Sequence, residues 1–392
     1  MSLFLRKQLF HFINWVSRRF FASRLSYSHV QAFLFNNSLK KLVNLARVFL
    51  DIRRGTEAVN SRPYLCALEI TNICNLHCPF CLTGKGISGG RAVRHMSFGE
   101  ARNIIDAVAD TVYMLQLYTW GEPLLNKDVL RIIEYAKSRN LYVMLSTNAT
   151  AMTSAYNSKL IESGIDYITV AIDGGSEDTY KKYRIGGNYP QVLANVQNLL
   201  AQKRGLGLDH PFVDWQFVVF RHNEHEVDTT ERLAYDMGIN KFTPLPAYVE
   251  DETWLPQGEK YRAATLYNPE RLMNCDRPWS HLNVRADGGV ASCCYEFFKK
   301  DDFGNLGETD FAAIWNNDFF RESRRLLGQA RRGEPLSPSH IICHDCIKTG
   351  VRPSLIDKNE APMVMKTIPV KVVAGTPVTA AKTHPAPQPP QP

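Results

Sequence analysis

Three cysteines with the spacing of metal ligands lie in one short segment of this chain. Cys74, Cys78 and Cys81 form a Cys-x3-Cys-x2-Cys pattern, with the aromatic residue Phe80 just before the last cysteine. Thiolates hold iron-sulfur clusters, and three of them leave one iron of a four-iron cluster open to a small molecule. The alternative is a structural zinc site in which His77 or a distant cysteine supplies the fourth ligand. The spacing predicts a metal centre in this segment.

A second group of cysteines lies in the C-terminal third of the chain. Seventeen residues separate Cys275 from Cys293, and Cys343 and Cys346 form a Cys-x2-Cys pair. Four thiolates suffice for one fully ligated iron-sulfur cluster, and such a cluster is suited to moving an electron because it has no open position. Cys-x2-Cys is also a common zinc spacing, so a zinc site with four cysteine ligands is the alternative. Cys294 stands beside Cys293 and could replace it as a ligand.

Alternating apolar runs and amphipathic segments must position these cysteines. The apolar runs lie at residues 64–71, 112–118, 141–146, 166–172, 212–220 and 241–245. Between them, Ser97 and Glu100 have the spacing of a capping box, and residues 127–138 and 189–202 have helical periodicity. Strands that alternate with helices imply an α/β fold with a parallel sheet, curved into a partial or full barrel. Ligands of such sheets bind at the carboxyl ends of the strands, and the first three cysteines follow the first strand directly.

The first cysteine pattern resembles the signature of the radical S-adenosylmethionine (SAM) superfamily, which has an aromatic residue just before the last cysteine. The resemblance implies that SAM binds the open iron of a [4Fe-4S] cluster through its amino and carboxylate groups. An electron from the cluster would then break the sulfonium bond and give a 5′-deoxyadenosyl radical. Phe80 would flank the adenine.

Two further segments are similar to SAM-binding elements of this family. Gly121 and Glu122 stand in a segment similar to Gly-Gly-Glu-Pro, where the carboxylate would accept a hydrogen bond from the SAM ammonium. Asn148 follows the third strand in a segment similar to Thr-Asn-Gly and is a candidate polar contact. Ala149 occupies the position where glycine is usual.

The fourth strand leads into a segment that resembles the Ser-Ile-Asp-Gly to Arg element of radical SAM proteins with a C-terminal cluster domain. Ala171 occupies the serine position, so one expected hydrogen bond to SAM is missing. Asp173 and Arg184 would then carry more of the polar recognition, with Arg184 on the SAM carboxylate.

The C-terminal cysteines resemble the Twitch module, the short form of the SPASM domain. The resemblance implies one auxiliary [4Fe-4S] cluster held by Cys275, Cys293, Cys343 and Cys346, because no cysteine follows Cys346. The expected architecture is a partial (β/α)6 radical SAM barrel with a small iron-sulfur module and an N-terminal helical arm. The expected boundaries are 1–60 for the arm, 61–265 for the barrel, 270–352 for the module and 361–392 for a disordered Pro-rich tail.

Charge is concentrated in the predicted arm. The formal net charge is +7, and residues 1–50 contain only basic charged residues, namely Arg6, Lys7, Arg18, Arg19, Arg24, Lys40, Lys41 and Arg47. A basic arm is a weaker sign of nucleic-acid binding than a basic folded face, so no nucleic acid is expected. The arm could lie on an anionic membrane surface or pack on the protein's own core. No apolar stretch is long enough to span a bilayer, which predicts a cytoplasmic protein, peripheral on the inner membrane face if the arm binds lipid, with a mitochondrial transit peptide as the alternative.

The resemblance implies a SAM-dependent radical oxidoreductase. The 5′-deoxyadenosyl radical would abstract hydrogen from a substrate, and the auxiliary cluster would oxidise the substrate radical. A one-electron reductant such as flavodoxin or ferredoxin is an expected partner. The substrate could be a small molecule, a lipid-linked molecule or a peptide, and the alternatives to this function are a peptide-modifying maturase and a non-catalytic scaffold stabilised by metal.

Overall fold

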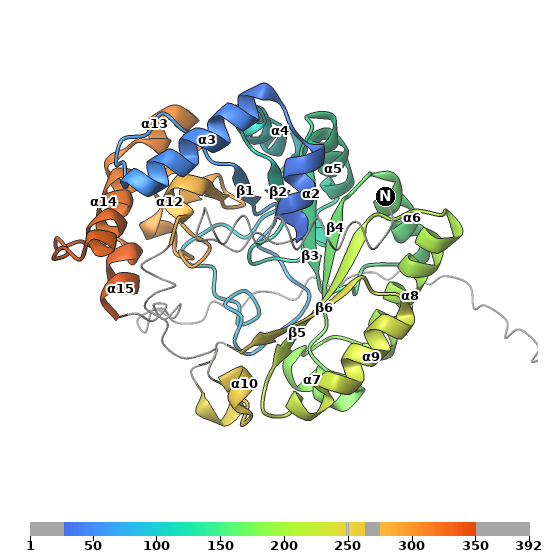
Figure 1. Cartoon of the computed structure of the whole chain (residues 1–392). Helices are drawn as coiled ribbons and strands as arrows, with labels where there is room; N and C mark the ends of the chain where they lie inside the picture. The colour runs from blue at the N-terminus through green and yellow to red at the C-terminus, as the bar shows by residue number, and fades with distance from the viewer. Residues whose placement is uncertain (1–26, 248, 250, 263–274, 350–392) are drawn as a thin grey trace, which may run out of the picture.

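The computed structural model describes residues 27–247, 249, 251–262 and 275–349 (Figure 1). Residues 1–26 of the predicted arm and the predicted tail at 361–392 lie outside the described residues. All the cysteines of the chain are described, and none of them forms a disulfide.

The apolar runs form the parallel strands that the sequence predicts. They are β1 (Leu65–Leu68), β2 (Met114–Gln116), β3 (Tyr142–Thr147), β4 (Tyr167–Ala171), β5 (Phe212–Val219) and β6 (Lys241–Pro246). Each strand pairs in parallel with the next one along the chain. β1 and β4 are buried at every residue, as expected for parallel strands covered on both faces.

The same sheet continues into the C-terminal module. β7 (His281–Val284) pairs in parallel with β1, and the antiparallel strands β8 (Gly289–Ala291) and β9 (Gly304–Asn305) follow. The strand order is β6-β5-β4-β3-β2-β1-β7-β8-β9, so β6 and β9 are the edges within the described part of the chain. The sheet is therefore a partial barrel. Because Leu68 lies opposite Val284, the carboxyl ends of β1 and β7 are adjacent.

Helices surround the strands on the outside of the molecule (Figure 1). They are α4 (Phe98–Val108), α5 (Val129–Ser138), α6 (Ser154–Glu162), α7 (Glu177–Tyr183), α8 (Tyr189–Gly205), α9 (Val227–Met237), α10 (Glu259–Arg262) and α12 (Arg277–Ser280), with short 3-10 turns at η1 (Pro123–Leu125), η2 (Glu224–Glu226), η3 (Glu252–Trp254) and η4 (Lys299–Asp301). The predicted capping box is present at α4, where Ser97 accepts from the backbone of Glu100 and Glu100 accepts from that of Ser97. In the described ranges, every helix is too short or too polar to cross a bilayer.

The sequence pattern near residues 311–327 predicts one helix. This prediction is wrong, because the structure has two helices there. They are α13 (Phe311–Trp315) and α14 (Asp318–Arg332), and α15 (Ile342–Thr349) follows. Asn317 caps α14 by accepting from the backbone N–H of Phe320. The side chain of Asn316 accepts from Val59 N at 3.0 Å and donates to Val59 O at 2.8 Å. The interruption between α13 and α14 therefore leaves the Asn316 side chain available to bind Val59, which is far away in the sequence.

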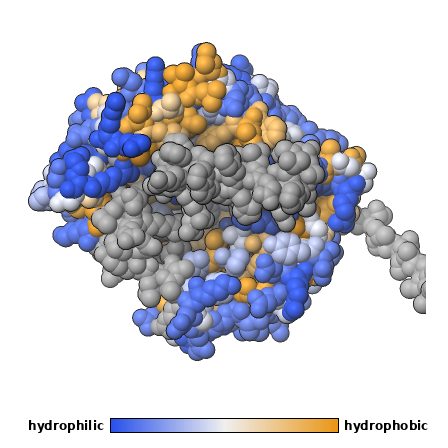
Figure 2. Space-filling model, in the orientation of Figure 1, coloured by the Kyte–Doolittle hydropathy of each residue, from blue (hydrophilic) through white to orange (hydrophobic). Residues whose placement is uncertain are grey.

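Two N-terminal helices, α2 (Tyr27–Phe35) and α3 (Leu39–Arg54), pack on the rest of the protein. Val48 of α3 is buried, and Arg331 of α14 donates to the carbonyl oxygen of Ile52 at 2.8 Å. This part of the predicted arm therefore belongs to the folded body. Its outer face carries exposed apolar side chains, namely Leu34, Phe35, Leu39, Leu42, Val43 and Leu50. Figure 2 shows apolar side chains gathered at the top of the molecule, where these helices lie in Figure 1.

Candidate metal and SAM site

The first three cysteines lie in the loop after β1, at the carboxyl edge of the sheet. Cys78 is buried, and Cys74 and Cys81 are partly buried. Burial, with a smaller contribution from the nearby Glu122, raises the pKa of the Cys74 thiol to about 12, and burial raises the pKa of Cys78 to about 11. Repulsion from Cys81 and Cys78 adds to the rise at Cys74, and repulsion from Cys81 adds to the rise at Cys78.

Hydrogen-bond donors surround these sulfur atoms. The backbone N–H of Leu76 donates to Cys74 Sγ at 3.5 Å, and Asn148 Nδ2 lies 3.9 Å from the same sulfur. Arg184 Nη1 lies 4.0 Å from Cys78 Sγ. N–H donors and a guanidinium favour thiolates, the form in which cysteine binds iron. The residues present therefore fit a thiolate-held iron-sulfur cluster.

Two glycines allow the cysteine loop to pack closely. A Cβ on Gly84 would lie 2.6 Å from the backbone of Cys78, and a Cβ on Gly121 would lie 2.1 Å from the carbonyl oxygen of Thr71. No side chain fits at such distances, so glycine is required at both positions. The sequence motifs point to Gly121 but not to Gly84, which lies beyond the cysteine pattern.

Glu122 is buried and connects the ends of two strands. Its Oε1 accepts from Thr147 Oγ1 at 2.8 Å and from Leu124 N at 3.1 Å, and its Oε2 accepts from Asn148 N at 2.7 Å. Burial raises the pKa of the Glu122 carboxyl, although these hydrogen bonds oppose the rise. A carboxylate has room for about four hydrogen bonds, so its lone pairs are not all used.

Asn148 connects the end of β3 to the cysteine loop. Its Nδ2 donates to Asn75 Oδ1 at 3.0 Å, and its Oδ1 accepts from the backbone N–H of Thr150 at 3.0 Å. The next residue, Ala149, has a φ of 60°, in the left-handed region. That conformation is unfavourable for a residue with a Cβ, which explains why glycine suits this position.

Ala149→Gly is expected to raise the free energy of unfolding by about 1 kcal/mol, because it removes the strain of a Cβ in the left-handed region. Urea unfolding followed by circular dichroism measures the change. Ala109→Gly is the matched control, since Ala109 is also buried but has a right-handed φ of −59°. The free energy of unfolding of the control variant should fall by roughly 0.5–1 kcal/mol. Equal losses in both variants would contradict the assignment of strain to Ala149.

Asp173 and Arg184 form a buried ion pair. Arg184 Nε donates to Asp173 Oδ2 at 2.6 Å, and the other oxygen of Asp173 accepts from Val218 N at 2.7 Å. Burial acts against the charge of Arg184, but Asp173 and Cys78 raise its pKa well above the usual value. A fixed cation thus lies between a carboxylate and the cysteine loop.

Phe80 belongs to an aromatic group beside this pair. Its ring stacks on that of Tyr183, with centroids 6.5 Å apart, and meets Trp254 edge-on at 5.0 Å. Phe220 packs against Tyr183 at 4.5 Å. The sequence motifs do not point to Tyr183 or Trp254. Tyr183 precedes Arg184 directly, whereas Trp254 lies in η3, a segment without any motif.

The C-terminal cysteines also gather in one region. Burial raises the pKa of Cys343 well above the usual value, and Cys275 and Cys346 add to that rise. The guanidinium of Arg277 interacts with the thiols of Cys275 and Cys293. Cys343 therefore interacts with Cys275 and Cys346, and Arg277 connects Cys275 with Cys293. Among the described residues, no three Cys, His, Asp or Glu side chains are arranged around a point that could hold a single metal ion.

Glu296 supports the backbone that carries Cys293. Its Oε2 accepts from Cys293 N at 3.3 Å and from Ser292 N at 2.6 Å. Burial raises the pKa of Glu296 to about 7. Cys293 Sγ accepts from Tyr295 N at 3.3 Å, while Cys294 also interacts with Arg277. Both adjacent cysteines thus lie near Arg277.

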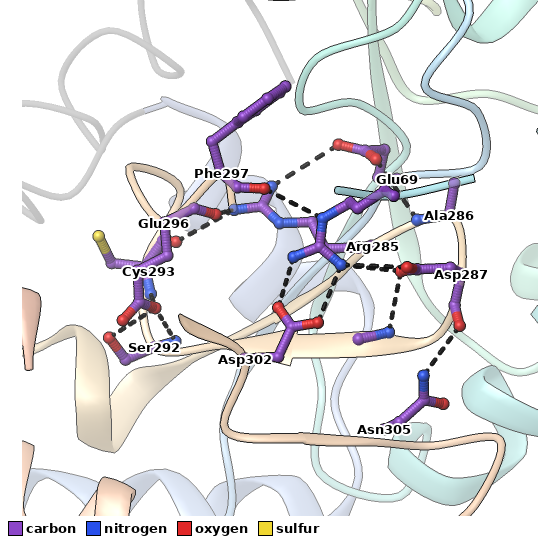
Figure 3. A network of polar contacts seen from close by, with 12 residues as sticks. Glu69, Arg285, Ala286, Asp287, Ser292, Cys293, Glu296, Phe297, Asp302 and Asn305 are labelled. Atoms are coloured by element: carbon purple, nitrogen blue, oxygen red, sulfur yellow. Dashed lines mark hydrogen bonds and ion pairs between the residues drawn. The ribbon is translucent and has the colours of Figure 1, made fainter. Parts of the chain in front are cut away.

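A buried polar network connects the segment after the first cysteine loop to the C-terminal module (Figure 3). Arg91 Nη1 donates to Asp287 and to Asp302, each at 2.9 Å. Its Nε donates to the carbonyl oxygen of Phe297 at 3.0 Å. The Arg91 side chain is 3% exposed, so these ion pairs are shielded from solvent.

A second pair of the network lies at the adjacent ends of β1 and β7. Arg285 Nη1 is 3.6 Å from Glu69 Oε2, and Arg285 Nη2 donates to the carbonyl oxygens of Cys293 and Glu296. Burial raises the pKa of Glu69, and the neighbouring guanidinium of Arg285 opposes the rise. Neither Glu69 nor Arg285 belongs to one of the motifs predicted from the sequence.

Comparison with known protein families gives two matches. Residues 68–233 match the Radical SAM superfamily, and residues 275–347 match SPASM, an iron-sulfur cluster-binding domain. The first match contains the cysteine loop and the segments of Glu122, Asn148 and Arg184. The second begins at Cys275 and ends one residue after Cys346.

Individual relatives match over part of their length. An AdoMet-dependent heme synthase of Methanosarcina barkeri is 32% identical over 46% of this chain and 50% of that protein. A PqqA peptide cyclase of Bradyrhizobium diazoefficiens is 25% identical over 62% of this chain and 60% of that protein. The chain thus spans about half to three-fifths of these curated relatives. The crystal structure of Streptococcus suis SuiB has a similar fold, with a TM-score of 0.55, 13% identity and 72% of each chain covered.

Proposed function

This chain belongs to the radical SAM superfamily and carries a C-terminal SPASM domain, and from this premise we propose that it is a SAM-dependent oxidoreductase. Its substrate would bind at the carboxyl edge of the sheet and lose hydrogen there. The observation that carries the proposal is the cysteine loop of Cys74, Cys78 and Cys81, with sulfur atoms that face N–H donors and the guanidinium of Arg184.

Two iron-sulfur clusters and SAM are the cofactors of this reaction. Cys74, Cys78 and Cys81 would hold the SAM-binding [4Fe-4S] cluster. An auxiliary [4Fe-4S] cluster would be held by Cys275, Cys293, Cys343 and Cys346. When bound, the first cluster and SAM supply a 5′-deoxyadenosyl radical for hydrogen abstraction, and the auxiliary cluster supplies an electron acceptor.

The chain's own residues would bind and orient SAM. Arg184 offers a cation to the SAM carboxylate, and its ion pair with Asp173 fixes the guanidinium in place. Glu122 would accept from the SAM ammonium while it holds Asn148 beside the cysteine loop. The aromatic group around Phe80 would cover the adenine and exclude water.

Arg184→Lys is expected to weaken SAM binding about tenfold to a hundredfold, because a hydrogen bond between charged groups contributes roughly 1.5–3 kcal/mol. Lysine keeps the charge but cannot bind Asp173 and a second partner with a planar fork. Equilibrium dialysis of labelled SAM against anaerobically reconstituted protein measures the affinity. Arg102→Lys is the control, since Arg102 is exposed on α4. Unchanged SAM affinity in Arg184→Lys would refute the role of Arg184.

The experiment that tests the proposed function is SAM cleavage by the whole chain. Anaerobic reconstitution, iron and sulfide analysis, and reduction with dithionite should give 5′-deoxyadenosine. Failure to form it with both clusters loaded would favour a scaffold stabilised by metal. A flavodoxin or ferredoxin is the proposed physiological reductant, and it should replace dithionite in this assay.

A second candidate is a peptide-modifying enzyme, which the likeness to PqqA peptide cyclase favours. Fractionated extracts of deuterium-labelled cells that make this protein can separate this candidate from an enzyme that oxidises a small molecule or a lipid-linked molecule. Deuterium should appear in 5′-deoxyadenosine only with the fraction that contains the substrate. Transfer from the peptide fraction supports the maturase, and transfer from either other fraction excludes it.

We also propose that the outer face of α2 and α3 contacts an anionic membrane surface. Phe35 and Leu39 are 69% and 78% exposed, and Arg47, Arg53 and Arg54 lie on the same helix as Leu39. Exposed apolar side chains with nearby cations suit a lipid interface, where each cation contributes roughly 1 kcal/mol.

Phe35→Asp with Leu39→Glu is expected to abolish co-sedimentation of the full-length chain with phosphatidylglycerol vesicles. The two acids remove apolar contact and repel the anionic surface. Leu206→Glu is the matched control, because Leu206 is also 62% exposed but lies at the end of α8. The proposal fails if the double variant pellets as well as the control.

A further inference from the structure

A pocket lies between the first cysteine loop and the C-terminal module. Glu69, Trp120 and Arg285 line it from the carboxyl ends of β1, β2 and β7. Thr83 and Arg91, from the segment after Cys81, line another side, together with Asn72, Ile87, Ser88, Val93 and Phe297. The residues of one wall therefore follow the first cysteine group in the sequence. Arg285 and Phe297 belong to the C-terminal module, which carries the second cysteine group.

The pocket contains buried polar atoms that lack partners within the described part of the chain. Glu69 and Arg285 are 2% and 1% exposed. Glu69 Oε2, Arg285 Nε and Arg285 Nη1 have no hydrogen bond there, and neither does Trp120 Nε1. The 3.6 Å between Arg285 Nη1 and Glu69 Oε2 is too long for one. A buried polar atom without a partner costs about 1–3 kcal/mol, so these atoms are suited to bind a ligand group.

The other charged groups around the pocket are already satisfied. Arg91 is paired with Asp287 and Asp302. Arg285 Nη2 binds the backbone carbonyls of Cys293 and Glu296, which are labelled in Figure 3. The atoms left for a ligand are the indole N–H of Trp120 and two charged groups, namely one edge of the Arg285 guanidinium and one oxygen of Glu69. Their opposite charges compensate each other. An anion would be repelled by Glu69 and a cation by Arg285, so an uncharged group fits best.

We propose that this pocket binds an uncharged group of the substrate that carries a hydrogen-bond acceptor and a donor on the same or neighbouring atoms. An alcohol and a primary carboxamide share this chemistry. The ligand oxygen accepts from Arg285, and its O–H or N–H donates to Glu69. Trp120 and Phe297, whose rings meet edge-on at 5.1 Å, offer an apolar wall to the neighbouring carbon atoms. The inference rests on the proposed function, because it assigns the group to the substrate of that reaction.

Binding of four small probes to the anaerobic holoenzyme with SAM tests the pocket. Saturation-transfer NMR compares acetamide, ethylene glycol, acetate and methylammonium. We expect acetamide or ethylene glycol to bind at least tenfold more tightly than either ion, and the better of the two identifies a carboxamide or an alcohol. Tighter binding of an ion to the wild-type protein, or no binding of any probe, would overturn the proposal.

Glu69→Gln shows whether the probes bind in this pocket. Without the carboxylate, the charge of Arg285 is uncompensated. The affinity for acetate should therefore rise at least tenfold relative to the affinity for the uncharged probes. Trp120→Phe is a second variant that keeps the ring and removes the N–H, and it should weaken the uncharged probes several-fold. Glu100→Gln is the control, because Glu100 is an exposed carboxylate on α4. Unchanged selectivity in Glu69→Gln and unchanged affinity in Trp120→Phe would place the probes elsewhere.

SAM cleavage measured on the same samples separates two kinds of failure. Wild-type protein that forms 5′-deoxyadenosine but binds no probe rejects the pocket and leaves the proposed function intact. Protein that binds the uncharged probes with the expected selectivity but forms no 5′-deoxyadenosine rejects the proposed function. In that case the pocket is confirmed as a binding site, and its assignment to a substrate of this reaction is withdrawn.

Discussion

Replacement of Cys74, Cys78 and Cys81 by alanine is expected to abolish SAM cleavage and to remove about half of the bound iron, since each cluster contributes the same number of iron atoms. The loop would lose every thiolate of the SAM-binding centre, while the cysteines of the C-terminal module stay in place. Iron and sulfide analysis after anaerobic reconstitution gives the metal content. Reduction with dithionite and detection of 5′-deoxyadenosine gives the activity.

Two comparisons make this result specific. Cys66→Ala should retain iron and activity, because Cys66 is buried inside β1 and belongs to neither cysteine group. Cys343→Ala with Cys346→Ala should lose the other half of the iron and still form 5′-deoxyadenosine. Full iron content in the triple variant would contradict the assignment of the first loop as a cluster site. Zinc in place of iron in the wild-type protein would contradict it as well.

Arg91→Met is expected to lower the free energy of unfolding by about 3–5 kcal/mol, the usual effect of removing one partner from a buried ion pair. Asp287 and Asp302 would face each other without a cation, and their side chains are only 10% and 11% exposed. The loss should appear as a lower thermal midpoint of the holoenzyme. Faster proteolysis of the C-terminal module should accompany it, because the ion pairs connect that module to the barrel.

Arg94→Met is the matched control for this prediction. Arg94 is three residues away and forms its ion pair with Glu100, in which both side chains are more than a third exposed. Exposed pairs contribute roughly 0–1 kcal/mol, so the control should unfold almost as the wild type does. Addition of Asp302→Asn to Arg91→Met should recover part of the loss. Equal destabilisation by Arg91→Met and Arg94→Met would show that the buried network stabilises the fold no more than an exposed ion pair does.

The sequence predicted the barrel and the first cysteine loop well, because local patterns determine both. Each of the six apolar runs became a parallel strand, and the cysteine pattern follows β1 as expected. The capping box of Ser97 and Glu100 was also readable, since both partners lie within one helical turn. The sequence shows alanine at position 149, where glycine is usual, but only the structure shows that this residue has a positive φ.

The polar network could not be predicted, because its partners are far apart along the chain. Arg91 and Asp302 are separated by 211 positions, and Glu69 meets Arg285 only because β7 pairs with β1. No local sequence pattern predicts such a pairing. The break between α13 and α14 has the same origin, since Asn316 binds Val59, which is 257 positions away.

The pairing of β7 with β1 also limits how this protein can be shortened. A chain that ended before β7 would leave the four residues of β1 with exposed N–H and C=O groups along an open edge. Such edges recruit strands from other molecules, so the remnant would aggregate instead of working as a smaller enzyme. For the same reason the C-terminal module is held against the barrel by strand hydrogen bonds, and not by a flexible linker alone.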